Sequence, residues 1–291
     1  MSIDILQEKI RKLKNPTIVD LSILPEHIPS HIRKSEEPVG DYLRFCRELL
    51  EGLKDLVPGV RLSFGQLALM GGEGLAALSE LTRAARQLGY YVILDSTEIL
   101  TPWSADRAAA AFFGENSQYP CDALVMSPYI GSDALKSFAP YCREGKKALF
   151  PAVRTPNKSA SELQDLLTGS RHVHTAAVDI LSRTEETMLG KFGYSNIGAL
   201  AAAGTGNVLK NLRAKYPRLF LLVDGYDYPG GNAKNASLAF DGMGRCAAVC
   251  AGPSITAAWY MVETDGTDFV EQAVLAAQRM KRTLGGYLTF L

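Results

Sequence analysis

The sequence lacks an excess of charge of either sign, because its 31 Lys and Arg residues are matched by 31 Asp and Glu residues. No basic stripe is present that could follow a nucleic-acid backbone, so we expect no nucleic-acid partner. No apolar run reaches the length of about 18 residues that marks a membrane span, so we expect no membrane insertion. The first 16 residues interleave charges with Ile5, Ile10 and Leu13, which predicts a short amphipathic helix and not a secretion signal.

Cysteine and histidine are scarce, and neither is spaced for a metal. The chain has five Cys and four His residues, with no CxxC pair and no zinc-like spacing between the two types. The cysteines are Cys46, Cys121, Cys142, Cys246 and Cys250, and all lie in apolar stretches. We interpret them as small core residues of a cytoplasmic protein, and we expect neither a metal nor a cofactor.

Apolar strand-like runs alternate with amphipathic helical stretches along the whole chain. Hydrophobic residues make up 47% of it and charged residues 21%, which indicates a large core. The strand-like runs are 17–22, 59–64, 90–95, 123–127, 147–153, 197–202, 219–223 and 246–250. The helical stretches between and after them include 40–56, 74–88, 105–113, 134–143, 208–215, 233–240 and 268–284.

Eight βα units without a break in composition predict one domain, residues 1–291, folded as a single (β/α)8 TIM barrel. An open, doubly wound sheet is the alternative, but it normally has fewer strands, and no GxGxxG follows the first run. The segment 159–191 is longer than a usual connection. It predicts an extra helix or a flap over the barrel mouth.

Charged residues stand at the ends of several runs, where a barrel keeps its chemistry. Asp95 could act on a substrate or cap the following turn. Arg61 could bind an anion or form an internal ion pair with a carboxylate such as Asp95. Asp224 and Asp227 could complete a new polar cluster with these two, or even a divalent-metal site.

The loops after the later runs offer fewer reactive groups. Gly230 and Gly231 precede a helix and could bind phosphate through their N–H groups, but from the glycines alone we favour a tight turn. Pro253 offers a phosphate neither an N–H nor a polar side chain. His172 and His174 fall in the long segment, where solvated histidines are commoner than catalytic ones.

Taken together, these loops resemble those of the bacterial type 2 orotidine 5'-phosphate decarboxylases. The likeness covers most of the chain: the motif NPTIV from residue 15, SPYIGSD from residue 127, TPN with a later QD in 155–165, GYSNIG from residue 193, and the 230–231 glycine pair. Residues 92–114 match the family's signature strand and helix without a gap. The resemblance implies a barrel that makes UMP and a homodimer whose active site spans both subunits. It also implies ligand contacts from Ser127, Tyr129, Thr155, Asn157, Gly230 and Gly231.

The resemblance places the family's alternating Lys and Asp array on positions that have changed. The family's Asp-x-Lys-x-x-Asp reads Asp95-Ser-Thr97-Glu-Ile-Leu100 in this sequence. Asp95 is retained, the proton-donating Lys is Thr97, and the Asp that reaches the partner subunit is Leu100. The strand-two Lys is Arg61, and an Asp at the end of strand one is Ser22.

The family's phosphate-binding Gln and Arg correspond to Pro229 and Pro253. Losing these ligands would remove the remote binding energy that such enzymes use for catalysis. We therefore predict a diverged, non-catalytic or repurposed paralogue and not an efficient decarboxylase. It would bind a small molecule, for which a nucleotide is one candidate, as a homodimer or as a mixed dimer with an active relative.

Two alternatives stay open. The chain could be a functional decarboxylase with a rearranged site, in which Lys158, Lys191 or Glu98 reaches the substrate, with Lys158 having the only believable path. It could also be a different small-molecule lyase on the same barrel, since barrels host many reactions. Leu100 lies beside Pro102 and Trp103 in sequence, which favours an apolar contact between subunits.

Overall fold

The computed structural model describes residues 1–34, 37–96, 99–183, 188–204 and 206–289. Within these residues, eight parallel strands close into a barrel in the order β1-β10-β9-β8-β5-β4-β3-β2. They are β1 (Thr17–Asp20), β2 (Gly59–Ser63), β3 (Tyr91–Asp95), β4 (Ala123–Met126), β5 (Ala148–Arg154), β8 (Ala199–Ala202), β9 (Leu221–Asp224) and β10 (Ala247–Ala251). Each overlaps one of the eight predicted runs. The single (β/α)8 barrel is confirmed, and the open sheet is wrong.

The strands are buried on both faces, because successive side chains point alternately into the barrel and toward the outer helices. On β1, Ile18 belongs to the apolar cluster inside the barrel and its neighbour Val19 to the cluster under the helices. On β3, Ile93 and Val92 divide in the same way. This alternation decides which residues at the strand ends face the barrel mouth.

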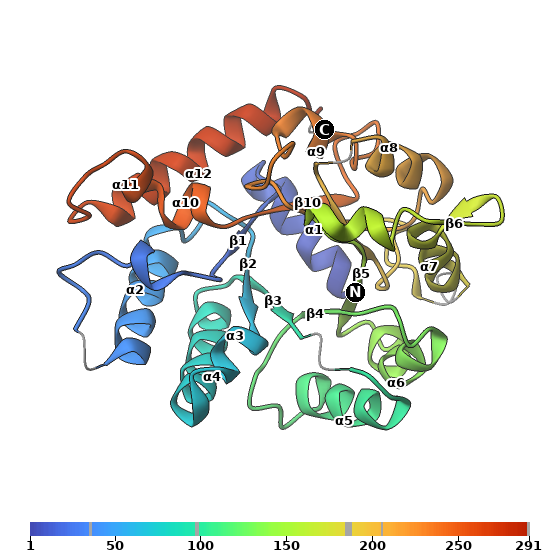
Figure 1. The fold of residues 1–291 in the computed structure, drawn as a ribbon, viewed down its shortest axis with the longest axis horizontal. Helices are drawn as coiled ribbons and strands as arrows, with labels where there is room; N and C mark the ends of the chain where they lie inside the picture. Colours follow the sequence, from blue (N-terminus) through green and yellow to red (C-terminus); the bar gives the residue numbers. More distant parts are fainter. Residues whose placement is uncertain (35–36, 97–98, 184–187, 205, 290–291) are drawn as a thin grey trace.

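A ring of helices surrounds the strands (Figure 1). The predicted helices are found as α2 (Pro38–Gly52), α4 (Gly71–Gln87), α5 (Pro102–Phe113), α6 (Ser132–Arg143), α8 (Gly206–Lys215), α9 (Ala233–Ser237) and α12 (Phe269–Gly285). Short helices that the sequence did not predict are η1 (Pro25–His27), α3 (Phe64–Ala68), α10 (Pro253–Thr256) and α11 (Ala258–Met261). Two of these short helices, α3 and α10, follow a strand almost directly, at the barrel mouth.

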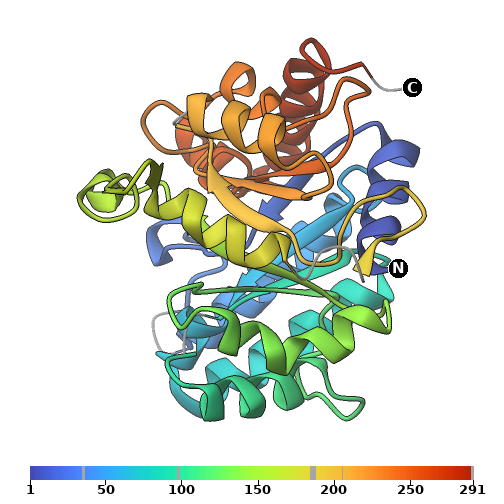
Figure 2. The ribbon, with the colours of Figure 1, turned by 90° about the vertical axis from the view of Figure 1, so that its right-hand side faces the viewer.

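The long segment contains the extra helix that the sequence predicts, α7 (Val173–Ser182). Before it come η2 (Lys158–Glu162) and a hairpin of β6 (Leu167–Thr168) and β7 (Arg171–His172). Figure 2 shows this part of the chain, in yellow-green, projecting from the side of the barrel opposite α1 (Ser2–Leu13). The segment therefore lies on the side where the strands end.

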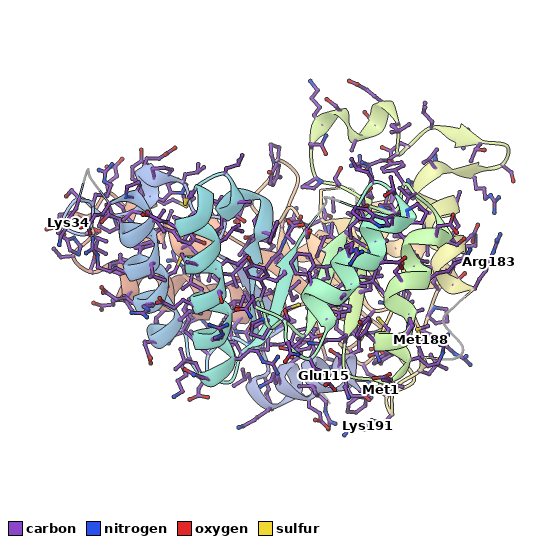
Figure 3. The ribbon with its side chains drawn as sticks, turned by 90° about the horizontal axis from the view of Figure 1, so that it is seen from below. Met1, Lys34, Glu115, Arg183, Met188 and Lys191 are labelled. Atoms are coloured by element: carbon purple, nitrogen blue, oxygen red, sulfur yellow. The ribbon has the colours of Figure 1, made fainter. Side chains whose placement is uncertain are left out.

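Helix α1 closes the other end of the barrel, as an amphipathic helix should. Its apolar residues Ile3, Leu6 and Ile10 are fully buried and join the cluster inside the barrel. Asp4 accepts hydrogen bonds from the backbone N–H groups of Lys191 and Phe192. Figure 3 shows Met1 and Lys191 together at this closed end.

The described residues include no helix long and apolar enough to cross a bilayer. All five cysteines are buried and none forms a disulfide with another described residue, which confirms their interpretation as core residues.

The closed end depends on one buried amide. The Asn196 side chain accepts a hydrogen bond from the Ile3 N–H at 3.1 Å and donates one to the Cys142 carbonyl at 2.9 Å. Asn196→Ala should lower the free energy of unfolding by about 1–3 kcal/mol, because it leaves the buried Ile3 N–H unpaired and removes one of the two hydrogen bonds to the Cys142 carbonyl, which also accepts from the Gly145 N–H. Urea denaturation measures this, with the exposed Asn116→Ala as the control expected within about 0.5 kcal/mol of wild type. An unchanged unfolding midpoint for Asn196→Ala would contradict this role.

Candidate functional site

The barrel mouth contains an arginine surrounded by three carboxylates. Arg61 Nη2 lies 2.6 Å from Asp95 Oδ2, while its Nη1 lies 3.1 Å from Asp224 Oδ2 and 3.6 Å from Asp20 Oδ2. These four residues, from β2, β3, β9 and β1, are called the Arg61 cluster below. The internal ion pair predicted for Arg61 and Asp95 is confirmed.

Strand periodicity brings the three carboxylates to the same place. Asp20, Asp95 and Asp224 each lie two residues beyond an inward-facing apolar residue, namely Ile18, Ile93 and Leu222. Residues two apart on a strand share a face, so all three carboxylates point into the mouth. Asp20 is also the register partner of Arg61 on the neighbouring strand.

Asp20 is a functional candidate that the sequence reasoning missed. The resemblance placed Ser22 at the end of strand one, in the position of the family's Asp, but β1 ends at Asp20, so that placement is wrong. The signal was present, because Asp20 ends an apolar run just as Asp95 does. In the structure Asp20 Oδ1 accepts a hydrogen bond from the Ser22 N–H at 2.9 Å.

The Arg61 cluster is strongly acidic as a unit. Three ionised carboxylates around one guanidinium leave a formal charge of −2. Burial acts to lower the pKa of Arg61, but the three carboxylates outweigh it and hold that pKa well above its ordinary value. Burial raises the pKa of Asp20, and the Arg61 charge offsets this only in part. Arg61 is 8% exposed, so solvent screens these charges weakly.

A pocket of about 350 Å³, called the mouth pocket below, adjoins the cluster. Its described lining consists of Asp20, Ser22, Leu24, Asp224, Gly225, Tyr226, Asp227, Tyr228, Pro229, Cys250, Gly252 and Pro253. None of these lining residues is basic, and three are acidic. Such a pocket favours a neutral or cationic ligand over an anion.

Asp227 does not join the Arg61 cluster, although the sequence allowed it. Its Oδ2 accepts a hydrogen bond from the Gly252 N–H at 2.6 Å and so links the loops after β9 and β10. The described residues contain no group of three or more His, Cys, Asp or Glu side chains arranged to hold a metal ion. The suggested divalent-metal site is therefore not supported, because Arg61 occupies the space between the carboxylates.

The Gly230–Gly231 pair forms the tight turn that its sequence favoured. Gly230 has a φ of 86°, and a Cβ on Gly231 would lie 2.2 Å from the Gly225 carbonyl oxygen. The Gly231 N–H donates to the Tyr228 carbonyl at 2.8 Å, so this donor is already used within the loop. Ligand contact by either glycine stays a prediction.

The other predicted ligand contacts lie on loops after β4 and β5. Tyr129 is 54% exposed, and its N–H donates to Ser127 Oγ at 3.3 Å. Thr155 bonds both to Asn157 Oδ1 at 2.6 Å and, through its N–H, to Gln164 Oε1 at 2.8 Å. These groups form two local networks with side chains available to solvent, and their roles in binding stay predictions.

The expectation of solvated histidines is correct for His172 and wrong for His174. His174, at the start of α7, is 4% exposed and stacks on the His172 ring at 5.0 Å. Burial lowers the pKa of His174, against the effect of its hydrogen bond to the Gln164 carbonyl. Arg154, which the sequence reasoning did not single out, pairs through Nε with Asp165 at 2.9 Å and fixes the base of this segment.

The remaining candidates differ in where they lie. Thr97 and Glu98 fall outside the described residues. Leu100 is 75% exposed. Lys191 pairs with Glu8 of α1 at the closed end of the barrel, so it cannot serve the mouth. Lys158 is exposed at the start of η2.

No protein-family model matches the sequence. Among curated proteins, an orotidine 5'-phosphate decarboxylase of Rhodopirellula baltica is 28% identical over 295 residues, which cover 97% of this chain and 98% of the relative. One from Clostridium novyi is 27% identical, with coverage of 97% and 98%.

Solved structures show the same barrel. OMP decarboxylase from Leishmania donovani superposes with a TM-score of 0.73 at 23% identity and covers 97% of this chain and 99% of its own. The orotidine 5'-monophosphate decarboxylase of Plasmodium berghei gives a TM-score of 0.76 at 13% identity, with coverage of 98% of both chains. The chain therefore resembles orotidine 5'-phosphate decarboxylases in sequence over nearly its whole length, and it shares their fold.

Proposed function

We propose that this chain is a diverged member of the orotidine 5'-phosphate decarboxylase family that does not decarboxylate orotidine 5'-phosphate efficiently and instead binds another small molecule. The observation that carries the proposal is the Arg61 cluster. Where the family's strand-two Lys would stand, this chain has a buried guanidinium already bound to three carboxylates.

The barrel mouth is poorly suited to the proton transfer that decarboxylation of orotidine 5'-phosphate requires. Decarboxylation leaves a carbanion on the pyrimidine ring, which must receive a proton from a nearby acid. Arg61 cannot supply it, because an arginine does not deprotonate in proteins and the three carboxylates raise its pKa further. The resemblance assigns the donor position to Thr97, whose hydroxyl is too weak an acid near neutral pH.

The charge of the mouth also opposes the family's substrate. Orotidine 5'-phosphate carries a carboxylate and a phosphate, and both would approach a cluster of formal charge −2. At an effective dielectric constant near 20, two like charges 4 Å apart repel by about 4 kcal/mol. The described lining of the mouth pocket offers no basic side chain to offset this. A neutral or cationic ligand avoids the repulsion.

The alternative is a working decarboxylase in which Lys158 has taken over as the acid. Lys158 is exposed on the loop after β5 and forms no ion pair with any carboxylate among the described residues, so its ammonium is available. A different small-molecule lyase on this barrel is the other alternative, and the Arg61 cluster would then hold its substrate.

We further propose that the protein acts in the cytoplasm as a homodimer or as a mixed dimer with an active relative. Leu100 and Trp103 are 75% and 68% exposed near the mouth. A second subunit that covered these two side chains would remove their apolar surface from water.

The proposal is tested by direct assay of turnover. Purified protein should show no measurable decarboxylation of orotidine 5'-phosphate and no calorimetric binding of UMP, whereas the Rhodopirellula baltica relative assayed in parallel should show both. Clear turnover by the wild-type protein would contradict the proposal. Loss of that turnover in both Asp95→Asn and Lys158→Ala would then establish the Lys158 alternative.

The partly buried Asp20 carboxylate should reduce stability at neutral pH. The pKa of Asp20 in the folded protein lies above the ordinary 3.8, so folding favours the protonated carboxyl. The stabilisation that the protonated form gives is present at low pH and is lost as the pH rises through the folded pKa. Asp20→Asn should therefore be more stable than wild type at pH 7 by on the order of 1 kcal/mol. The difference should shrink toward pH 4.

Thermal unfolding across that pH range measures the effect. The exposed Glu115→Gln is the control, and its stability should follow wild type at every pH. An Asp20→Asn protein less stable than wild type at pH 7 would show that the ion pair with Arg61 outweighs the desolvation of Asp20.

Self-association should depend on Leu100. Leu100→Asp should weaken a dimer at least tenfold, because it places a desolvated charge in an apolar contact. Analytical ultracentrifugation measures the dissociation constant. Leu275→Asp, on the outer helix α12, is the matched control, since Leu275 is also partly exposed at 42%. Equal dissociation constants for the two variants would place the interface elsewhere.

A further inference from the structure

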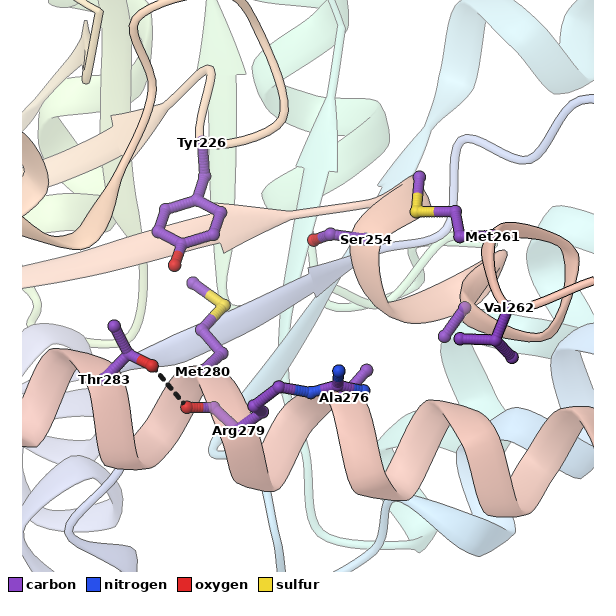
Figure 4. Close-up of a pocket in the computed structure, with 9 residues that line it drawn as sticks. Tyr226, Ser254, Met261, Val262, Ala276, Arg279, Met280 and Thr283 are labelled. Carbon is purple, nitrogen blue, oxygen red and sulfur yellow. Dashed lines mark hydrogen bonds between the residues drawn. The ribbon is translucent and has the colours of Figure 1, made fainter.

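A second pocket, of about 250 Å³, lies outside the mouth between α10, α11 and α12 (Figure 4). It is called the α12 pocket below. Its described lining consists of Tyr226, Ser254, Ala258, Met261, Val262, Ala276, Arg279, Met280 and Thr283. Tyr226 also lines the mouth pocket, so one side chain separates the two.

The α12 pocket has the opposite electrostatic character to the mouth pocket. Its described lining contains one basic residue, Arg279, and no acidic residue. The Arg279 guanidinium forms no ion pair or hydrogen bond with any other described side chain, and the residue is exposed to solvent. A guanidinium without a carboxylate partner beside a cavity is suited to bind a planar anion through two parallel N–H groups.

Two hydroxyls add to this donor set. Ser254 Oγ is buried and has no hydrogen-bond partner among the described residues, although a buried hydroxyl is normally satisfied. Figure 4 shows Ser254 and the Tyr226 hydroxyl directed toward the space between the lining residues. Burial raises the pKa of Tyr226, so its phenol stays protonated and can donate.

The rest of the lining is apolar. Met261, Val262 and Met280 border the pocket together with two alanines. Met261 is 58% exposed and Val262 47%, more than apolar side chains at a well-packed helix contact usually are. Since an apolar cavity of about 150 Å³ accepts benzene, the α12 pocket has room for a ring and a short charged arm.

We propose that the α12 pocket binds a small organic monocarboxylate with an aromatic or branched apolar body. The carboxylate would lie against Arg279 and the Ser254 and Tyr226 hydroxyls, and the body would cover Met261, Val262 and Met280. Because the pocket shares no residue with the Arg61 cluster, this proposal does not depend on whether the mouth decarboxylates. Tyr226 would let an occupant influence the mouth pocket beside it.

Binding of phenylacetate to the full-length protein tests the proposal. Saturation-transfer NMR and calorimetry should detect saturable binding, with neutral phenylacetamide at least tenfold weaker and inorganic phosphate weaker still. Arg279→Gln should weaken phenylacetate binding at least tenfold. Arg282→Gln, an exposed arginine on the same helix that does not line the pocket, should leave it unchanged.

A second variant tests the rim of the pocket from a different element. Val262→Asp adds a negative charge at an exposed place on the rim, where folding is not at risk, and it should also weaken phenylacetate binding severalfold. Absence of saturable binding to wild type would overturn the proposal. Binding that Arg279→Gln and Val262→Asp both leave unchanged would overturn it too, since phenylacetate would then lie elsewhere. Equal affinity for the acid and the amide would show that the carboxylate is not recognised.

Discussion

The ion pairs of Arg61 determine how the barrel mouth is built. A guanidinium that is 8% exposed must be paired, because an uncompensated buried charge costs several kcal/mol. The pairing joins the ends of β1, β2, β3 and β9, including strands that are not neighbours in the barrel. Any ligand that enters the mouth therefore meets charges that already stabilise one another.

This constraint gives Asp95 a structural role that is separate from catalysis. At 2.6 Å, it forms the shortest of the three ion pairs with Arg61. Removing it would leave the guanidinium with only the pairs to Asp224 and the more distant Asp20. Asp95 would thus be kept in a protein that no longer decarboxylates, and its presence alone does not argue for activity.

The sequence predicts the barrel and the strand-end positions of this site better than it predicts the ion-pair partners of Arg61. The barrel follows from apolar runs and helical stretches, which are local patterns, and so does the placing of Asp95 and Asp224 at strand ends. Arg61 could equally have met an anion or a carboxylate, because its partners come from strands more than 30 residues away along the chain. The choice depends on register and closure, which the local pattern does not contain.

The burial of His174 and the bonding of Asp227 were not predicted for the same reason, namely that both depend on contacts outside the local sequence. The sequence predicts a solvated His174 because it lies in a long connecting segment, yet its packing at the start of α7 buries it. Asp227 joins the mouth loops through the Gly252 backbone, and a backbone partner leaves no trace in a side-chain pattern. The α12 pocket is formed by residues from three helices and one loop, so no sequence motif marks it.

The two pockets suggest how a diverged barrel could gain a new ligand without rebuilding its core. The mouth pocket carries acidic side chains, the α12 pocket carries a free guanidinium, and Tyr226 stands between them. Opposite charges held apart by a rigid aromatic side chain favour a ligand with separated charges, or two ligands that bind side by side. A single change at the loop after β9 would alter both pockets, because Tyr226 follows the Gly225 turn directly. The loop after β9 is therefore the part of the chain that borders both pockets, while the strand ends supply the carboxylates of the mouth.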